Sequence, residues 1–278
     1  MTHPKLDLLK PRLMAIVNAT PDSFSDGGLV FSNSQIDISK VAARIDQLVE
    51  EGADIIDVGG ESTRPGAKQV GLQEEMDRVL PVVEWAAANT ELAISVDTSS
   101  PELMTAAAQK GAHLINDVRA LTRRNAIEAA AATGLMVCLM HMQGKPDTMQ
   151  QAPQYENPIV EVSTFLQERV LACLDAGMGA QQLWLDPGFG FGKTLEHNLS
   201  LLRQLSELGS LGFPVLVGLS RKSMIDHLLN RKIDERLPAS LALALMALER
   251  GAKILRVHDV APTRDIIDTF VAVHENTH

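Results

Sequence analysis

Two hydrophobic patterns alternate along this chain. One pattern consists of long stretches, such as 35–52 and 194–209, in which apolar residues recur at helical spacing. The other consists of short, almost unbroken apolar runs that lie between these stretches. The short runs are rich in β-branched residues and cover 13–17, 54–58, 92–96, 113–115, 135–140, 182–185, 214–217 and 253–257. Strands covered on both faces read as unbroken apolar runs. The pattern therefore predicts eight buried parallel strands with helices between them.

The connections between these segments differ at the two ends of each predicted strand. Several helical stretches end in a glycine suited to a left-handed C-cap, and the next strand follows within about two residues; these glycines are Gly52, Gly111, Gly134, Gly177 and Gly251. The connections that leave the strands are longer, polar and rich in Gly, Pro, Asp and Ser. We therefore predict an α/β fold, a (β/α)₈ TIM barrel in which residues 1–278 form a single domain. A doubly wound parallel sheet is the alternative.

Composition limits the kinds of partner and the cellular compartment that we expect for this protein. The 278 residues carry 25 Lys and Arg against 35 Asp and Glu, a net charge of −10, so no general affinity for nucleic acid or anionic membranes is expected. No run approaches the roughly 18 apolar residues of a membrane span, and the first residues lack the apolar core of a secretory signal. Two cysteines make neither a disulfide framework nor a zinc site, and Cys138 reads as a buried hydrophobe. We expect a cytoplasmic protein.

Polar side chains follow the predicted strands at the end where a barrel of this kind carries its active site. Carboxylates that directly continue an apolar run are less ordinary than polar loop residues, although each could also serve a turn or a helix cap. The strand-end groups are Asn18, Asp57, Asp97, Asn116, Asp117, His141, Asp186, Ser220, Arg256 and His258.

Three of the following loops carry further signals. NATPDSFSDGG (18–28) is punctuated by Pro and Gly, and GGESTRPGA (59–67) offers a hydroxyl and a guanidinium suited to an oxyanion. DPGFGFGKT (186–194) ends like a Walker A motif, but that motif requires glycine at position 187, which is proline. We read it instead as a glycine loop with Phe189 and Phe191 as aromatic walls.

Basic residues gather after the last two predicted strands. Arg256 and His258 are two positions apart at a strand end and therefore point to the same side. Lys222 follows the seventh strand, and the loops after strands seven and eight form the usual phosphate site of this fold. The predicted mouth thus suits a flat, nitrogen-rich ring and a phosphate or pyrophosphate, with Mg²⁺ held by one or two oxygen ligands plus substrate phosphates.

Seven motifs, in order, give the chain a resemblance to a known family. NATPDSFSDGG, DVGGESTRPGA, SVDTS, HLINDVRA, LDPGFGFGK, GLSRKSMI and RVHDV, spread from about residue 12 to 262, resemble the bacterial dihydropteroate synthases. The resemblance implies a (β/α)₈ barrel, usually a homodimer, that binds two small molecules. It further implies a Mg²⁺-dependent transferase of folate biosynthesis, a target of sulfonamides, that joins (7,8-dihydropterin-6-yl)methyl diphosphate to 4-aminobenzoate and releases pyrophosphate.

The resemblance also implies roles for residues that match the motifs. The pterin ring would contact Asp97, Asn116, Asp186 and Lys222. The diphosphate would contact Asn18, Thr63, Arg64, Arg256 and His258, with Asn18 also binding Mg²⁺. The aminobenzoate site would be shaped by Phe24, Pro65, Phe191 and Ser223. The residues expected to act in catalysis are Asp97, Lys222, Arg256, His258 and Asp26, the last either stabilising a cation or ordering its loop.

Two other functions stay open at this point. A pterin-dependent methyltransferase of related barrel type would pass a methyl group to a corrinoid, but it should not need the first two loops or the Arg256–His258 pair. A catalytically silent pterin-binding paralogue is the other, and losses in the loops or at Lys222 would favour it.

Overall fold

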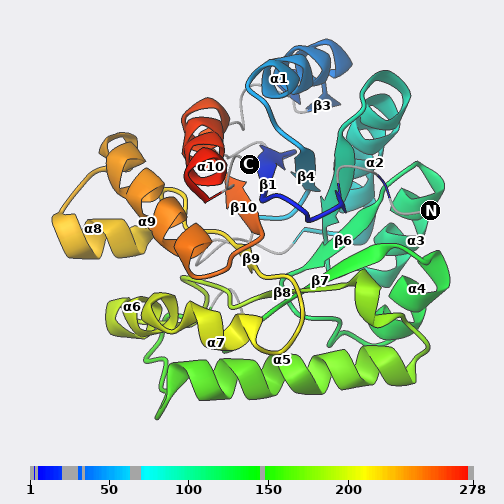
Figure 1. Ribbon diagram of the computed structural model, residues 1–278. Coiled ribbons are helices and arrows are strands. Elements are labelled where there is room, and N and C mark those ends of the chain that lie inside the picture. The colour runs from blue at the N-terminus through cyan, green and yellow to red at the C-terminus, as the bar shows by residue number, and fades with distance from the viewer. Residues whose placement is uncertain are drawn as a thin grey trace.

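The computed structural model shows parallel strands arranged in a ring and surrounded by helices (Figure 1). It describes residues 3, 6–20, 31–32, 35–62, 70–144 and 148–274. The eight strands of the main sheet are β1 (Arg12–Asn18), β4 (Ile55–Gly59), β5 (Ala93–Asp97), β6 (Leu114–Asp117), β7 (Met136–Met140), β8 (Leu183–Asp186), β9 (Leu216–Val217) and β10 (Ile254–Val257). Two short strands, β2 (Phe31–Ser32) and β3 (Gln35–Ile36), pair separately as an antiparallel hairpin.

The ring closes in chain order, which distinguishes a barrel from a doubly wound sheet. The order is β8-β7-β6-β5-β4-β1-β10-β9, so the first and last strands of the ring, β1 and β10, lie side by side. The remaining seam joins β8 to the β9 segment by a parallel bridge between Leu185 and Val215, and the Leu185 N–H donates to the Pro214 carbonyl at 2.9 Å. The predicted (β/α)₈ barrel is therefore confirmed.

The helices cover the outside of the ring. They are α1 (Ile38–Glu50), α2 (Leu72–Asn89), α3 (Pro101–Gln109), α4 (Ala126–Thr133), α5 (Pro158–Asp175), α6 (Leu195–Arg203), α7 (Leu205–Gly209), α8 (Ser223–Leu229), α9 (Leu237–Glu249) and α10 (Val260–His274). All five glycines expected at helix ends have positive φ angles, between 69° and 98°, as a left-handed C-cap requires. Two units carry a second helix that the hydrophobic pattern does not separate, α7 and α9. No helix in the described part of the chain has the length and hydrophobicity that a membrane crossing requires.

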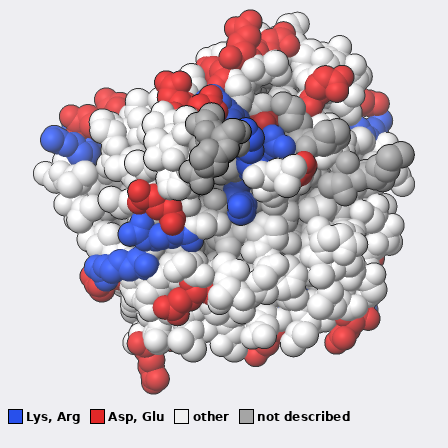
Figure 2. Space-filling view, in the orientation of Figure 1, with Lys and Arg blue, Asp and Glu red and all other residues white. Residues whose placement is uncertain are grey.

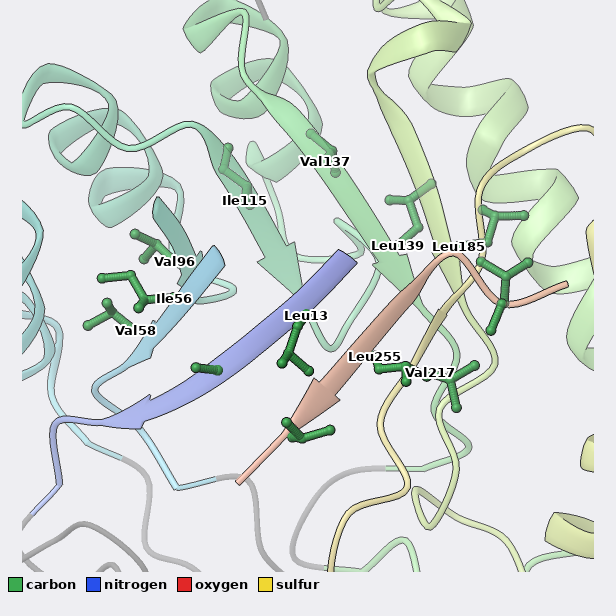
Figure 3. Packing of buried hydrophobic residues seen from close by; sticks show 14 of the residues in the cluster. Leu13, Ile56, Val58, Val96, Ile115, Val137, Leu139, Leu185, Val217 and Leu255 are labelled. Carbon is green, nitrogen blue, oxygen red and sulfur yellow. The ribbon is translucent and has the colours of Figure 1, made fainter. Parts of the chain in front are cut away.

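Side chains of each strand alternate between two apolar layers. Outward residues such as Leu13, Val137 and Leu255 pack between the sheet and the helices (Figure 3). A smaller cluster fills the inside of the ring and is closed below by Leu6 from the N-terminal segment; it includes Met14, Ile55, Ala93, Leu114, Cys138, Trp184 and Ile254. Cys138 is fully buried, as the sequence predicts.

Candidate active site

The polar groups at the strand ends continue the inner face of the barrel. Successive residues of a strand point to opposite faces, so a residue two positions beyond an inner apolar residue also points inward. Ile55 is followed in this way by Asp57, Leu114 by Asn116, Trp184 by Asp186 and Ile254 by Arg256. The same strands that fill the base of the barrel with apolar side chains therefore line its mouth with charged and amide groups.

Asp57 is the centre of the first cluster. Its carboxylate is fully buried and accepts hydrogen bonds from the Ser95 hydroxyl at 2.6 Å and from the Asn116 amide at 3.0 Å. The Nε of Arg256 donates to the second oxygen at 2.6 Å. Asp57 thereby joins strands β4, β5, β6 and β10 across the mouth and fixes the orientation of two predicted ligand-binding side chains, Asn116 and Arg256.

Arg256 bridges Asp57 to Asp97, because its Nη2 donates to Asp97 Oδ2 at 2.9 Å. Burial works to lower the pKa of Arg256, but the two carboxylates outweigh it and raise that pKa, so the guanidinium stays charged. The pKa of Asp97 is raised to about 7. Burial is the main cause and Asp57 adds to it, whereas Arg256 opposes the rise. The mouth thus holds one guanidinium shared by two carboxylates.

Asp186 and Lys222 form the second cluster, on the opposite side of the ring order. Asp186 Oδ1 accepts the backbone N–H of Gly188 at 2.7 Å. Burial raises the pKa of Asp186, whereas this N–H and the Lys222 ammonium lower it. Burial lowers the pKa of Lys222 to about 8, and its Nζ donates to the Phe189 carbonyl at 2.7 Å. Because both groups lose solvation, a ligand that supplies N–H donors to Asp186 would stabilise its charged form.

The glycine loop (residues 187–193) lies between β8 and the helix that follows it. Gly188 and Gly192 have φ angles of 67° and 62°, which residues other than glycine rarely adopt. A Cβ at Gly188 would collide with the His141 carbonyl, and one at Gly192 with the Gln143 carbonyl. The glycines therefore allow the loop to pack against the segment after β7, which a phosphate-binding P-loop would not require.

Phe191 and Phe189 differ in position, which corrects part of the sequence interpretation. The Lys222 Nζ lies 4.2 Å from the centre of the Phe191 ring, so Phe191 faces the mouth as predicted. Phe189 is only 1% exposed and belongs to the hydrophobic core instead. Its side chain is no wall of the site, and only its carbonyl reaches Lys222.

The remaining predicted residues of the mouth are placed as follows. His258 Nδ1 lies 3.2 Å from the Ser220 hydroxyl, which also accepts the His258 backbone N–H at 3.2 Å. Asn18 is half-buried at the end of β1, and Ser223 begins α8 directly after Lys222. The other predicted site residues, Phe24, Asp26, Thr63, Arg64 and Pro65, lie outside the described residues.

Two strand-end groups serve the structure. Asp117 accepts the backbone N–H groups of Arg119 and Leu121 at 2.9 and 2.8 Å and a bond from Ser99, so it orders a turn. His141 pairs with Lys193, whose Nζ lies 3.0 Å from its Nδ1. Sequence reasoning gave no role to Lys193 or Ser95 and none to Asp57 beyond its place at a strand end. Its only signal for Asp57 was an aspartate inside the apolar run IIDV.

The described residues contain no group of three or more His, Cys, Asp or Glu side chains arranged to hold a metal ion. Mg²⁺ needs no such cage, since it keeps several waters and binds through one or two protein oxygens plus substrate phosphates. The amide oxygen of Asn18 is a donor of that type at the correct end of β1. The donor set therefore fits Mg²⁺ carried in with a diphosphate.

Charge is distributed unevenly on the face shown in Figure 2. Lys and Arg side chains gather in the upper middle of that view, whereas many acidic side chains lie toward its edges. A chain with a net charge of −10 thus carries a local basic region. Such a region attracts an anionic substrate against the overall charge.

Residues 14–258 match the family model described as pterin binding enzyme. The chain is 53% identical over 274 residues to the dihydropteroate synthase of Escherichia coli strain K12, covering 98% of this chain and 95% of the relative. It is 47% identical to the dihydropteroate synthase of Neisseria meningitidis serogroup C, with 98% and 96% covered.

Solved structures agree in fold over nearly the same length. The Yersinia pestis dihydropteroate synthase in a sulfonamide drug complex has a TM-score of 0.92 at 48% identity, with 96% of each chain covered. The Xanthomonas albilineans enzyme with 4-aminobenzoic acid has a TM-score of 0.88 at 48% identity, covering 97% and 95%. The same enzyme in complex with 7,8-dihydropteroate has a TM-score of 0.85 at 45% identity, covering 97% and 96%.

Proposed function

This chain belongs to the dihydropteroate synthase family, transferases of folate biosynthesis, and from that premise we propose how its own residues carry out the reaction. The substrates are (7,8-dihydropterin-6-yl)methyl diphosphate and 4-aminobenzoate, and the products are 7,8-dihydropteroate and pyrophosphate. The observation that carries the proposal is the pair of clusters at the barrel mouth. Asp186 with Lys222 suits a ring edge, and Arg256 between two carboxylates suits a leaving anion.

The pterin ring binds between the two clusters in this proposal. Asp186 accepts two N–H bonds from the 2-amino and N3 edge of the ring, as it would from a guanidinium. Asn116 has its amide nitrogen committed to Asp57, so its amide oxygen is the atom available to another ring N–H. Lys222 and Asp97 complete the ring contacts, and the Lys222 ammonium, which has three donors, keeps its bond to the Phe189 carbonyl.

The leaving diphosphate binds on the Arg256 side. The Nε and Nη2 of Arg256 hold Asp57 and Asp97, so we assign its Nη1 to the diphosphate. His258 contributes beside it, and Asn18, Thr63 and Arg64 complete the contacts. Mg²⁺, when bound with Asn18 and the phosphates, neutralises charge on the pyrophosphate. Fixed positive groups act most strongly on charge that develops as the bond breaks.

The chemistry then follows from the substrate. Ring nitrogens of the electron-rich dihydropterin stabilise a cation at the methylene carbon, so the C–O bond to pyrophosphate breaks before the new C–N bond forms. The aromatic amine of 4-aminobenzoate attacks that carbon and loses one proton, and its neutral nucleophilicity removes the need for a strong base. Phe24, Pro65, Phe191 and Ser223 shape the aminobenzoate subsite, where a sulfonamide would compete. Asp26 stabilises the cation or orders its loop.

We also propose a cytoplasmic homodimer. Several apolar side chains on α8, α9 and the turn between them are exposed, and they are Leu228 (50%), Leu229 (49%), Ile233 (44%), Leu245 (36%) and Met246 (43%). A second copy would cover this surface. Both cysteines are buried free thiols, as is usual in a reducing compartment.

The deciding experiment is pyrophosphate release on mixing the protein with both substrates and Mg²⁺, with dihydropteroate identified as the second product. Full-length similarity to synthases at about half identity favours this outcome over the methyltransferase. Methyl transfer from methyltetrahydrofolate, without pyrophosphate release, would reverse the assignment. Binding of a pterin without turnover would support the silent paralogue.

The pterin site is tested by Asp186→Asn. An asparagine would spend its one oxygen on the Gly188 N–H and present an NH₂ group to the ring N–H donors. Losing a charge-assisted bond costs about 1.5–3 kcal/mol, so we expect at least a roughly tenfold loss of affinity in calorimetric titration with a pterin analogue. Glu84→Gln, at an exposed surface ion pair, is the control. Unchanged affinity in Asp186→Asn rejects the assignment.

A further inference from the structure

The glycine loop encloses a buried lysine that the proposed mechanism does not use. Lys193 is only 3% exposed, and its side chain turns back under its own loop. The Nζ donates to the Gly188 carbonyl at 2.9 Å and to the Phe191 carbonyl at 3.0 Å, and it lies 3.0 Å from His141 Nδ1. An ammonium has three N–H donors, so these contacts satisfy the whole group.

The imidazole beside it is suited to accept one of those bonds. Burial and, to a smaller extent, the neighbouring Lys193 charge together lower the pKa of His141 to about 3. The ring is therefore neutral near pH 7. A neutral imidazole offers one acceptor nitrogen, here Nδ1. His141 also receives the packing of the loop, since Gly188 lies directly against its carbonyl.

Two lysines therefore bind three carbonyls of one short segment. Lys193 takes the carbonyls of residues 188 and 191 from beneath, and Lys222 takes the Phe189 carbonyl from the mouth. Lys222 also lies over the Phe191 ring. The position of the Lys222 ammonium is thus set by a loop whose own shape depends on the Lys193 ammonium.

Lys193 also acts on Asp186 through charge. The groups that lower the pKa of Asp186 against burial are the Gly188 N–H, Lys222, Arg256 and Lys193. Burial in turn lowers the pKa of Lys193 to about 7, and Asp186 opposes that shift while Lys222 adds to it. The Lys193 charge, present below about pH 7, thus adds to the groups that favour the ionised form of Asp186.

We propose that Lys193 is a positioning residue for the pterin pocket: its ammonium fixes the glycine loop, and the loop holds Lys222 beside Asp186. The inference rests on the proposed function, because it concerns the pocket assigned to the pterin. It explains why a lysine is enclosed at this point of the loop instead of facing a phosphate. It adds to the site a residue that contacts no substrate.

The test is Lys193→Met, which keeps the length and apolar stem of the side chain and removes the ammonium. Titration calorimetry measures the affinity for a pterin analogue lacking the diphosphate and, separately, for pyrophosphate with Mg²⁺. We expect pterin affinity to fall by about tenfold or more and pyrophosphate affinity to change less than about twofold, since Arg256 is held by Asp57 and Asp97 on other strands. Lys193→Gln, which keeps N–H donors without the charge, serves if the methionine variant does not fold.

A pH profile separates positioning from general support of the fold. Without the Lys193 charge the pKa of Asp186 rises, so on acidification below pH 7 pterin affinity is lost at a higher pH than in the unaltered protein. Tyr155→Phe removes a different bond to the same loop, from the Tyr155 hydroxyl to the Gly192 carbonyl at 2.9 Å. In that variant the pH at which pterin affinity is lost on acidification (the acid limb of the profile) should be the same as in the unaltered protein. Lys110→Met, at a remote surface pair, is the second control.

Three outcomes overturn the proposal. One is unaltered pterin affinity in Lys193→Met, or in Lys193→Gln where that variant replaces it. Another is an equal loss for both ligands with the acid limb unmoved, which would show only that Lys193 supports the fold. Failure of the unaltered protein to bind the pterin analogue overturns the proposed function and this inference together. If the unaltered protein binds the analogue, the Lys193 variants test this inference alone.

Discussion

The two ends of the barrel each contain a buried aspartate from the β4 region paired with an arginine from the last part of the chain. At the base, Asp54 Oδ2 accepts Arg264 Nη2 at 2.5 Å. At the mouth, Asp57 Oδ2 accepts Arg256 Nε at 2.6 Å. Both arginine side chains are 22% exposed, so burial does not distinguish the pairs. What distinguishes them is the set of further partners.

At the base the partners that the structure describes belong to the framework. Asp54 also accepts the Leu13 N–H at 2.9 Å and lies 3.5 Å from Arg12, while Arg264 donates twice to the Gly52 carbonyl. These bonds join the start of β1, the turn before β4 and α10. This arrangement holds the first strand, the turn before β4 and the last helix together.

At the mouth, by contrast, several of the partners are groups that we propose bind substrate. Arg256 is divided between Asp57 and Asp97, and Asp57 is divided between Arg256 and Asn116. Burial raises the pKa of Asp97 to about 7, and the neighbouring Asp57 adds to that rise while Arg256 opposes it. An active site is therefore recognised here by sharing of charges among strand ends and not by the presence of a buried ion pair.

The largest effect should come from Asp57→Asn. This change removes the charge partner of Arg256 and one anchor of Asn116, so we expect turnover to fall about 100-fold, since about 2.7 kcal/mol of lost transition-state stabilisation corresponds to that factor. Steady-state pyrophosphate release measures it. Ser95→Ala removes only the third partner of Asp57 and should cost less than about fivefold. Equal turnover in Asp57→Asn and the unaltered protein would show that Arg256 needs no fixed position.

A smaller and different effect is expected at the base. Asp54→Asn should lower the free energy of unfolding by about 2–3 kcal/mol, because it leaves Arg264 without its carboxylate in a partly solvated site. Turnover per folded molecule should stay within about twofold of the unaltered protein, in contrast to Asp57→Asn. Chemical denaturation followed by circular dichroism, with active-site titration, gives both quantities. A large loss of turnover at unchanged stability would contradict the comparison.

A third effect is the pH dependence of stability that Asp97 contributes. Its pKa is raised from 3.8 to about 7 on folding, through burial and the nearby Asp57, Asp117 and Glu75, opposed by Arg256. The folded state therefore binds the proton more tightly, and the stabilisation is complete below about pH 3.8 and is lost as the pH rises through about 7. Asp97→Asn should reduce the slope of stability against pH in that window.

Much of the framework follows from local pattern in the sequence. The run 13–17 predicts β1 to within a residue at each end, and the run 135–140 predicts β7 equally well. The strand-end positions of Asp97 and Asp186 follow from the same runs, because parallel strands bring their carboxyl ends to one edge. Period-two alternation also places Asp57 inside the barrel once Ile55 is known to face inward.

Other features depend on contacts between distant positions and leave no local pattern. Arg256 and Asp57 are 199 residues apart, and nothing near either residue identifies the other as its partner. Arg221, equally basic and beside Lys222, is held by Asp259 through Nε at 2.9 Å and so serves the framework. The sequence assigns no role to Lys193, because the carbonyls that it binds come together only when the loop has its left-handed turns.

The pairing of β1 with β10 has a consequence for how the protein is made. Arg12 lies opposite Ile254, so the ring closes only when nearly the whole chain has left the ribosome. Contacts between such distant positions carry a large loop-closure entropy and form late in folding. Arg256 stands two positions beyond Ile254 and reaches Asp57 across the same closure. The Arg256–Asp57 pair therefore forms only when the barrel closes, and a nascent chain with an open barrel lacks the fixed guanidinium that we propose binds the diphosphate.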